Sequence, residues 1–126
     1  MTKFLNVDLE IAGRSSLEPL AAELSPRMFA LYRGLEGKLE RAHYETRNQY
    51  DTAEQCLRNM LRVLGRMGPK ARACWRAASV RDFNVGVQSG AKPFLFEVPI
   101  SAATLAAVAK LGARIVLTVY APTRKK

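Results

Sequence analysis

Residues 81–121 constrain the fold most, because their apolar pattern changes period between strand-like and helix-like stretches. Phe83, Val85 and Val87 alternate with polar or small residues, which is the period of a half-buried strand. Residues 115–120 alternate in the same way and are rich in β-branched side chains. We therefore expect a strand near each end of this block.

The middle of the same block predicts a hairpin and a helix. Turn-forming residues at 89–93 precede an apolar run at 94–98, so we expect this run to fold back as a second strand. Ser101 is placed as the N-cap of a helix, and Gly112 is placed as its left-handed C-cap. The expected order in the block is strand, strand, helix, strand.

The first half of the chain adds a strand, a helix and a hairpin. Apolar and polar residues alternate over 5–11, which predicts a strand with one wet face. A short helix should follow and end at Ser25-Pro26. Residues 28–33 and 38–46 are expected to pair as strands around a turn that has a glycine at each end.

The most strongly amphipathic stretch runs from Asp51 or Thr52 to about Gly65 and predicts a helix. Its apolar arc consists of Ala53, Cys56, Leu57, Met60, Leu61, Val63, Leu64 and Met67. The pattern leaves residues 70–80 open between helix and loop, and Trp75 is expected to anchor them on the core.

These elements predict an α+β fold, a two-layer sandwich with a mostly antiparallel sheet and helices on one face. One arrangement that fits is a ferredoxin-like order of the first elements, extended by the hairpin–helix–strand block. We expect residues 1–121 to form a single domain and residues 122–126 to form a basic C-terminal tail.

Composition bounds the class of protein. A hydrophobic content of 48% and a charged content of 25% are typical of a globular protein. No secretory signal and no membrane span is expected, because Asp8 and Glu10 interrupt the first apolar stretch, and Lys110 and Arg114 interrupt the longest one. We expect the two lone thiols, Cys56 and Cys74, to be buried. A cytoplasmic location is the resulting expectation.

The net charge of +9 is unevenly distributed. Residues 1–68 hold ten Lys or Arg and nine acids, whereas residues 69–126 hold ten Lys or Arg and only two acids, Asp82 and Glu97. A basic half attracts anions, which are either phosphates or an acidic protein surface.

Residues for catalysis are sparse. The only histidine, His43, could act as a general base with Glu45 on the same side of a strand, but no nucleophile is placed around it. The acids between Glu36 and Glu54 are interleaved with cations, as on a solvated surface. No phosphate-binding loop is present. We therefore expect no catalytic residue, no cofactor and no metal.

A row of arginines is the strongest candidate for partner binding. Arg58, Arg62 and Arg66 are spaced to lie along the face of the amphipathic helix opposite its apolar arc. Arg72 and Arg76 continue the row, followed by Arg81. Guanidinium groups in such a row can contact a series of carboxylates or phosphates. We assign Arg58, Arg62, Arg66, Arg72 and Arg76 as candidate partner-binding residues.

Four features of residues 75–120 stand out together: Trp75, the strand Asp82-Phe83-Asn84-Val85-Gly86, the helix that opens at Ser101, and the final stretch from Leu111-Gly112 to Tyr120. In these features the sequence resembles a family of small bacterial α/β domains of unknown function. Such domains are similar to immunity-type proteins, which neutralise one cognate toxin by plugging it. The resemblance implies a protein partner and no enzymatic residue. Immunity proteins are often acidic, whereas this chain is basic.

Three hypotheses follow from the sequence. The first is a non-catalytic protein-binding module, of an immunity or adaptor type, with a toxin or another acidic protein as partner. The alternative is a general nucleic-acid-binding protein that uses the basic C-terminal half. The third is an enzyme that uses His43 and Glu45. The sequence also leaves open a homodimer through an edge strand.

Overall fold

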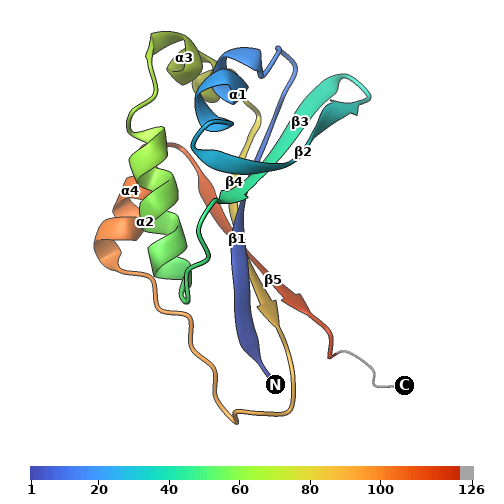
Figure 1. Cartoon of the computed structure of the whole chain (residues 1–126), viewed down its shortest axis with the longest axis vertical. Coiled ribbons are helices and arrows are strands. Elements are labelled where there is room, and N and C mark those ends of the chain that lie inside the picture. The colour runs from blue at the N-terminus through green and yellow to red at the C-terminus, as the bar shows by residue number, and fades with distance from the viewer. Residues whose placement is uncertain (123–126) are drawn as a thin grey trace.

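The computed structural model describes residues 1–122 and contains five strands and four helices (Figure 1). In chain order these are β1 (Lys3–Gly13), α1 (Glu18–Leu24), β2 (Met28–Glu36), β3 (Leu39–Thr46), α2 (Ala53–Leu64), α3 (Pro69–Ala77), β4 (Val80–Gln88), α4 (Ala102–Lys110) and β5 (Arg114–Tyr120). Residues 123–126 of the expected basic tail lie outside the described residues.

The five strands form one sheet in the order β2-β3-β1-β4-β5. The neighbours β2/β3, β3/β1 and β1/β4 are antiparallel, whereas β4 and β5 are parallel. The order β4-β1-β3-β2 is that of a ferredoxin-like βαββαβ unit. The strand β5 extends this unit beyond β4, to which it is joined through α4. The expected α+β fold with a mostly antiparallel sheet is confirmed.

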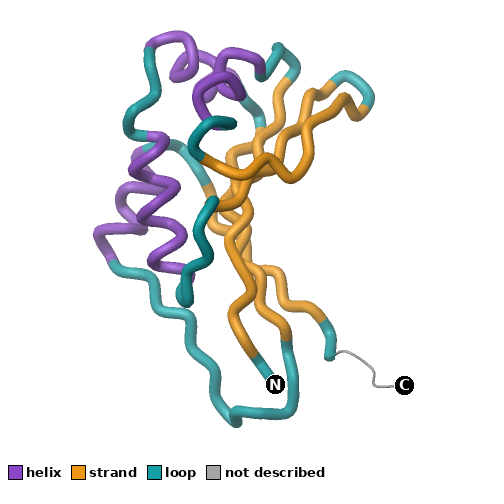
Figure 2. The backbone as a smooth tube through the Cα atoms, viewed as in Figure 1, coloured by secondary structure: helices purple, strands orange, loops and turns teal. Residues whose placement is uncertain are grey.

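The helices lie on one side of the sheet (Figures 1 and 2). The core forms where the alternating apolar residues of the strands meet the apolar stripes of the helices. Its largest fully buried side chains are Trp75, Tyr44, Phe83, Leu9, Ile11, Leu17, Leu20, Leu24, Met28, Leu57, Met60 and Leu64. The opposite face of the sheet carries the polar partners of the same alternation, among them Asn6, Asp8 and Glu10.

The expected strand at 94–98 is wrong. These residues form no strand and belong to a long connection from β4 to α4, which Figure 2 shows as a teal segment at the end of the molecule. The reason is that two segments, β5 and residues 94–98, could pair with the same edge of β4. The strand β5 pairs with β4 from Asp82↔Arg114 to Gln88↔Tyr120 and occupies the side of β4 that a hairpin partner would need. The apolar side chains of the connection are consequently exposed, Phe94 fully.

The ends of α2 and α4 follow the expected capping residues, whereas α1 begins after Leu17 without a side-chain cap. The Thr52 hydroxyl accepts a hydrogen bond from the Gln55 N–H at 3.2 Å at the start of α2. Ser101 does the same for Thr104 at the start of α4, and Gly112 adopts a φ of 70° after its end. Most of the open stretch 70–80 belongs to α3, which ends at Ala77, while Val80 already starts β4. Helix α3 begins with Pro69 at a position where no helical hydrogen bond is lost.

The cysteines differ in burial. Cys56 is buried in α2, as expected, but Cys74 is only partly buried, so that expectation is wrong. Cys74 lies beside Trp75 in α3, and its thiol contacts the Ser16 carbonyl at 3.4 Å near the surface. None of the helices in residues 1–122 is long and apolar enough to cross a membrane.

Candidate functional site

A groove of about 450 Å³ lies where α2, α3 and α4 meet. Its lining combines apolar side chains with three cations. The lining residues are Leu61, Leu64, Gly65, Met67, Arg72, Trp75, Arg76, Ala107, Lys110 and Leu111. A concave, mostly apolar surface with a few charged groups is the usual form of a binding site.

The groove is shaped by the break between α2 and α3 and by one long-range hydrogen bond. Helix α2 ends before Gly65, and Gly68 with Pro69 starts α3 in a new direction. The indole Nε1–H of Trp75 donates to the Leu111 carbonyl at 2.8 Å, so α3 is tied to the end of α4. Trp75 is 2% exposed and forms part of the groove floor. This hydrogen bond fixes the distance between α3 and α4, which form two walls of the groove.

Arg81 joins the C-terminal end of α3 to a residue that follows the end of α4, beside the groove. Its Nη1 lies at 3.1 Å from the Trp75 carbonyl, 3.1 Å from the Arg76 carbonyl and 3.0 Å from the Ala78 carbonyl. Its Nε donates to the Gly112 carbonyl at 3.0 Å. Arg81 therefore neutralises the carbonyl end of α3 and braces it against α4. It does not act as a free member of the arginine row.

The groove rim carries three exposed cations, Arg72, Arg76 and Lys110. Within residues 1–122 none of them forms a salt bridge. One Nη of Arg72 donates to the Met67 carbonyl at 3.1 Å, which holds that side chain against the turn. The positive charge around the apolar floor is therefore not compensated by a carboxylate of the described chain.

The structure brings together only two of the five candidate residues. Arg72 and Arg76 share the groove, where Lys110 joins them from α4. Arg58 turns back along α2 and forms a salt bridge with Glu54 at 2.7 Å. Arg62 and Arg66 are exposed but do not line the groove.

Glu54 is an anchor that the sequence did not reveal. Its carboxylate accepts hydrogen bonds from the Ser101 N–H at 2.9 Å and the Thr104 hydroxyl at 2.7 Å. The Thr104 hydroxyl contributes most and the Ser101 N–H next, and together with the Ser101 hydroxyl and Arg58 they lower the pKa of Glu54 to about 2. The anion lies at the N-terminus of α4, where the helix dipole favours it. Helix α4, which supplies one wall of the groove, is thus fixed to α2.

The open face of the sheet carries an acidic network. Asn6 Nδ2 lies 3.0 Å from both Asp8 Oδ1 and Glu45 Oε2, so one amide joins two carboxylates from neighbouring strands. Glu10 accepts from Asn84 at 3.3 Å on the same face. Partial burial, with added repulsion from Glu45 and Glu10, raises the pKa of Asp8.

His43 and Glu45 lie on the same side of β3, as the third hypothesis requires. His43 packs edge-to-ring against Tyr32, with ring centroids 5.7 Å apart. Its Nε2 is buried and has no hydrogen-bond partner in residues 1–122. Glu45 instead holds Asn6, and no His, Cys, Asp or Glu triad able to hold a metal occurs in the described chain.

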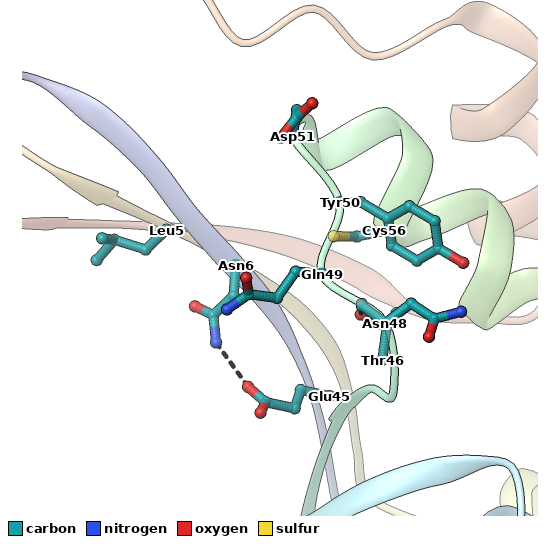
Figure 3. A pocket seen from close by; sticks show the side chains of 9 residues that line it. All are labelled: Leu5, Asn6, Glu45, Thr46, Asn48, Gln49, Tyr50, Asp51 and Cys56. Atoms are coloured by element: carbon teal, nitrogen blue, oxygen red, sulfur yellow. Dashed lines mark hydrogen bonds between the residues drawn. The ribbon is translucent and has the colours of Figure 1, made fainter.

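A second hollow, of about 390 Å³, lies where β3 parts from β1 (Figure 3). The two strands pair only over Leu9–Gly13 of β1, and the residues after β3 then bend toward α2. Glu45 and Asn6 face each other at one end of the hollow, whereas Asp51 lies at the other end. Its polar groups come from a loop and a strand edge, and no unpaired cation joins them in the lining.

The two sides of the molecule therefore differ in charge. The helix layer carries Arg62, Arg66, Lys70 and the three rim cations, all exposed. The open sheet face is mixed: it carries the acids Asp8, Glu10, Glu45 and Asp82, and the cations Lys3, Arg41 and Arg114. An anionic partner is therefore attracted more strongly to the helix layer than to the sheet face.

Sequence reasoning missed Lys110, Leu111 and Glu54. Lys110 and Leu111 lie far from the arginine row in the chain, and only the capping pattern at Ser101 and Gly112 indicated where α4 ends.

Comparison of the chain with models of protein families, with curated proteins and with solved structures finds no match. The resemblance of residues 75–120 to small bacterial domains stays a prediction.

Proposed function

We propose that the chain is a non-catalytic protein-binding module that takes up an acidic, amphipathic segment of its partner in the groove between α2, α3 and α4. The observation that carries this proposal is the uncompensated charge of Arg72, Arg76 and Lys110 around an apolar floor. Apolar side chains of the partner enter the groove, and its carboxylates meet the rim. An immunity-type or adaptor role fits such a module.

The construction of the floor favours a protein partner over a nucleic acid. Proteins that bind single strands place aromatic rings where bases can stack on them. Among the described residues that line the groove, Trp75 has the only aromatic ring, which is 2% exposed and whose N–H is already bonded to Leu111. The remaining apolar surface is aliphatic, which suits leucine-like side chains. The experiment must distinguish binding of a protein partner in the groove from phosphate binding by the exposed arginines of α2.

The test compares a groove variant with a matched control. The variant R76E/K110E reverses two rim charges that have no partner in the described chain. The control R14E/R27E reverses two exposed arginines that do not line the groove, so the net charge changes equally. Arg72 is left intact because its bond to Met67 also supports the turn.

Each form is immobilised and exposed to a nuclease-treated extract of the source cell. We expect one protein to be retained by the wild type and the control and lost by the groove variant. That protein, once purified, should saturate the wild type at one copy per groove in a calorimetric titration. Equal loss with both variants, or retention of material only in extracts without nuclease, would overturn the proposal in favour of general phosphate binding.

A further inference from the structure

We propose that β5 is an interface, and that its partner is the β5 of a second copy of this chain, paired antiparallel to form a continuous ten-stranded sheet. Strand β5 is the last strand of the sheet, so its outer edge has no neighbour within the described chain. Unpaired N–H and C=O groups along such an edge are a template for another strand.

The two edges of the sheet differ in how they oppose pairing. The other edge strand, β2, has a register shift between Ala30 and Tyr32, and it carries Arg33 and Glu36. It exposes apolar side chains, but the irregularity and the charges interrupt a regular ladder. Strand β5 pairs with β4 in unbroken register and has no charged residue and no proline after Arg114. Its edge is regular, apolar and unprotected.

The exposed side chains of β5 belong to the same face as the core. Leu117 and Val119 stand beside the buried Val85 and Val87 of β4, yet they are 60% and 57% exposed. Figure 1 shows β5 continuing past the helices toward the end of the sheet, so no helix covers this part. An apolar strip that continues from a core to an open edge is typical of an interface.

The sequence of β5 is complementary to itself when two copies pair about Leu117. Leu117 then faces Leu117, and Ile115 faces Val119 on the helix side of both copies. On the other side, Arg114 faces Tyr120 and not a second arginine. The twofold axis is perpendicular to the sheet, so both helix layers lie on the same side of it.

The charge of the edge also permits self-association, although the whole chain has a net charge of +9. Arg114 forms two parallel hydrogen bonds to the buried carboxylate of Asp82, at 2.9 and 2.8 Å. This pair is neutral. The next open-face residues of β5, Val116 and Thr118, are uncharged, and the Thr118 hydroxyl donates to Asn84 of β4 at 2.7 Å. Within residues 1–122, two copies can therefore approach at β5 without bringing unpaired cations together.

The decisive experiment uses position 117, because the twofold axis passes through it. We expect the wild type to sediment as a dimer, and L117K to sediment as a monomer because two lysines would face each other. L117E should behave in the same way. A mixture of L117K and L117E should recover the dimer, since opposite charges then meet across the axis. Circular dichroism of each variant checks that the exposed substitution leaves the fold intact.

The matched control is L35K on the opposite edge, where Leu35 is 76% exposed. It adds the same charge to β2 and should leave the dimer unchanged. A monomeric wild type, a dimer that persists in L117K, or a mixture of the two charged variants that stays monomeric would each overturn the proposal. The β5 edge shares no residue with the groove, so this result and the partner-binding result are independent.

Discussion

Glu54 and Ser101 are joined twice, through the backbone N–H of Ser101 to one carboxylate oxygen at 2.9 Å and through its hydroxyl to the other at 3.0 Å. Ser101 is the N-cap of α4, so this pair fixes the start of α4 to the first turn of α2. The wall of the groove that carries Lys110 and Leu111 is positioned from this point.

Replacing Glu54 with glutamine should destabilise the fold by about 1–3 kcal/mol at neutral pH, because a charged acceptor of several hydrogen bonds is lost. Chemical denaturation measures the change. Glu97→Gln is the matched control, since Glu97 is exposed in the connection before α4. An effect of E54Q no larger than that of E97Q would contradict the anchoring role.

The same contact predicts loss of stability in acid. The pKa of Glu54 is lowered from an ordinary value of 4.5 to about 2, so the folded state favours the anion. The stabilisation is complete above the unfolded-state value and disappears as the pH falls through the range down to about 2. Unfolding midpoints measured through this range should fall less steeply for E54Q than for the wild type. Parallel curves for the two proteins would argue against this assignment.

Asp8 should affect the pH dependence of stability in the direction opposite to Glu54. Its pKa is raised above 3.8 by burial and by Glu45 and Glu10, so the folded state favours the protonated form. The fold therefore loses stability as the pH rises through the raised pKa. We expect Asp8→Asn to stabilise the protein at neutral pH and to have no such effect in acid. Asp51→Asn, at an exposed site, serves as the control in the same denaturation series, and a destabilised D8N would refute the expectation.

In the groove, R76E and K110E should each weaken binding of the purified partner by about fivefold, or about 1 kcal/mol, since rim charges contribute modestly. The weakening should diminish at high salt. Calorimetric titration measures both effects, with R14E as a single-charge control. If R14E weakens binding as much as R76E, the groove is not the contact site.

The two thiols should react at different rates in the native state. Cys74 is partly buried near the surface, whereas Cys56 is enclosed in the core, and burial raises the pKa of each. We expect an alkylating reagent to label Cys74 first and Cys56 only when the structure opens. Mass spectrometry of digested samples locates the label. Rapid labelling of Cys56 would show that α2 packs less firmly than described.

The strands and the main helix could be predicted because their side-chain periods are local properties. The alternation at Phe83, Val85 and Val87 and the apolar arc of 53–67 both appear where expected. The prediction of a strand at 94–98 was wrong because strand pairing depends on residues elsewhere in the chain. Its residues suit a hairpin, but β5 takes the available edge of β4, and sequence patterns do not record which of two suitable segments wins.

Only part of the candidate site could be predicted from the sequence, because the other part depends on contacts between segments that are distant in the chain. Counting charges found Arg72 and Arg76, but it grouped Arg81 with them, and the structure uses Arg81 to hold helix-end carbonyls. Charge alone does not distinguish a cation that binds a partner from one that satisfies the backbone. Lys110 became part of the site only through the packing of α4 against α2.

The separation of charge between the helix layer and the open sheet face also affects how partners arrive. The exposed cations of the helix layer, set against the mixed charges of the open sheet face, give the molecule an uneven charge distribution. In the field of an acidic protein the molecule turns before contact, with its groove side leading. Many collisions then begin in a productive orientation, and the association rate, more than the lifetime of the complex, should depend on ionic strength.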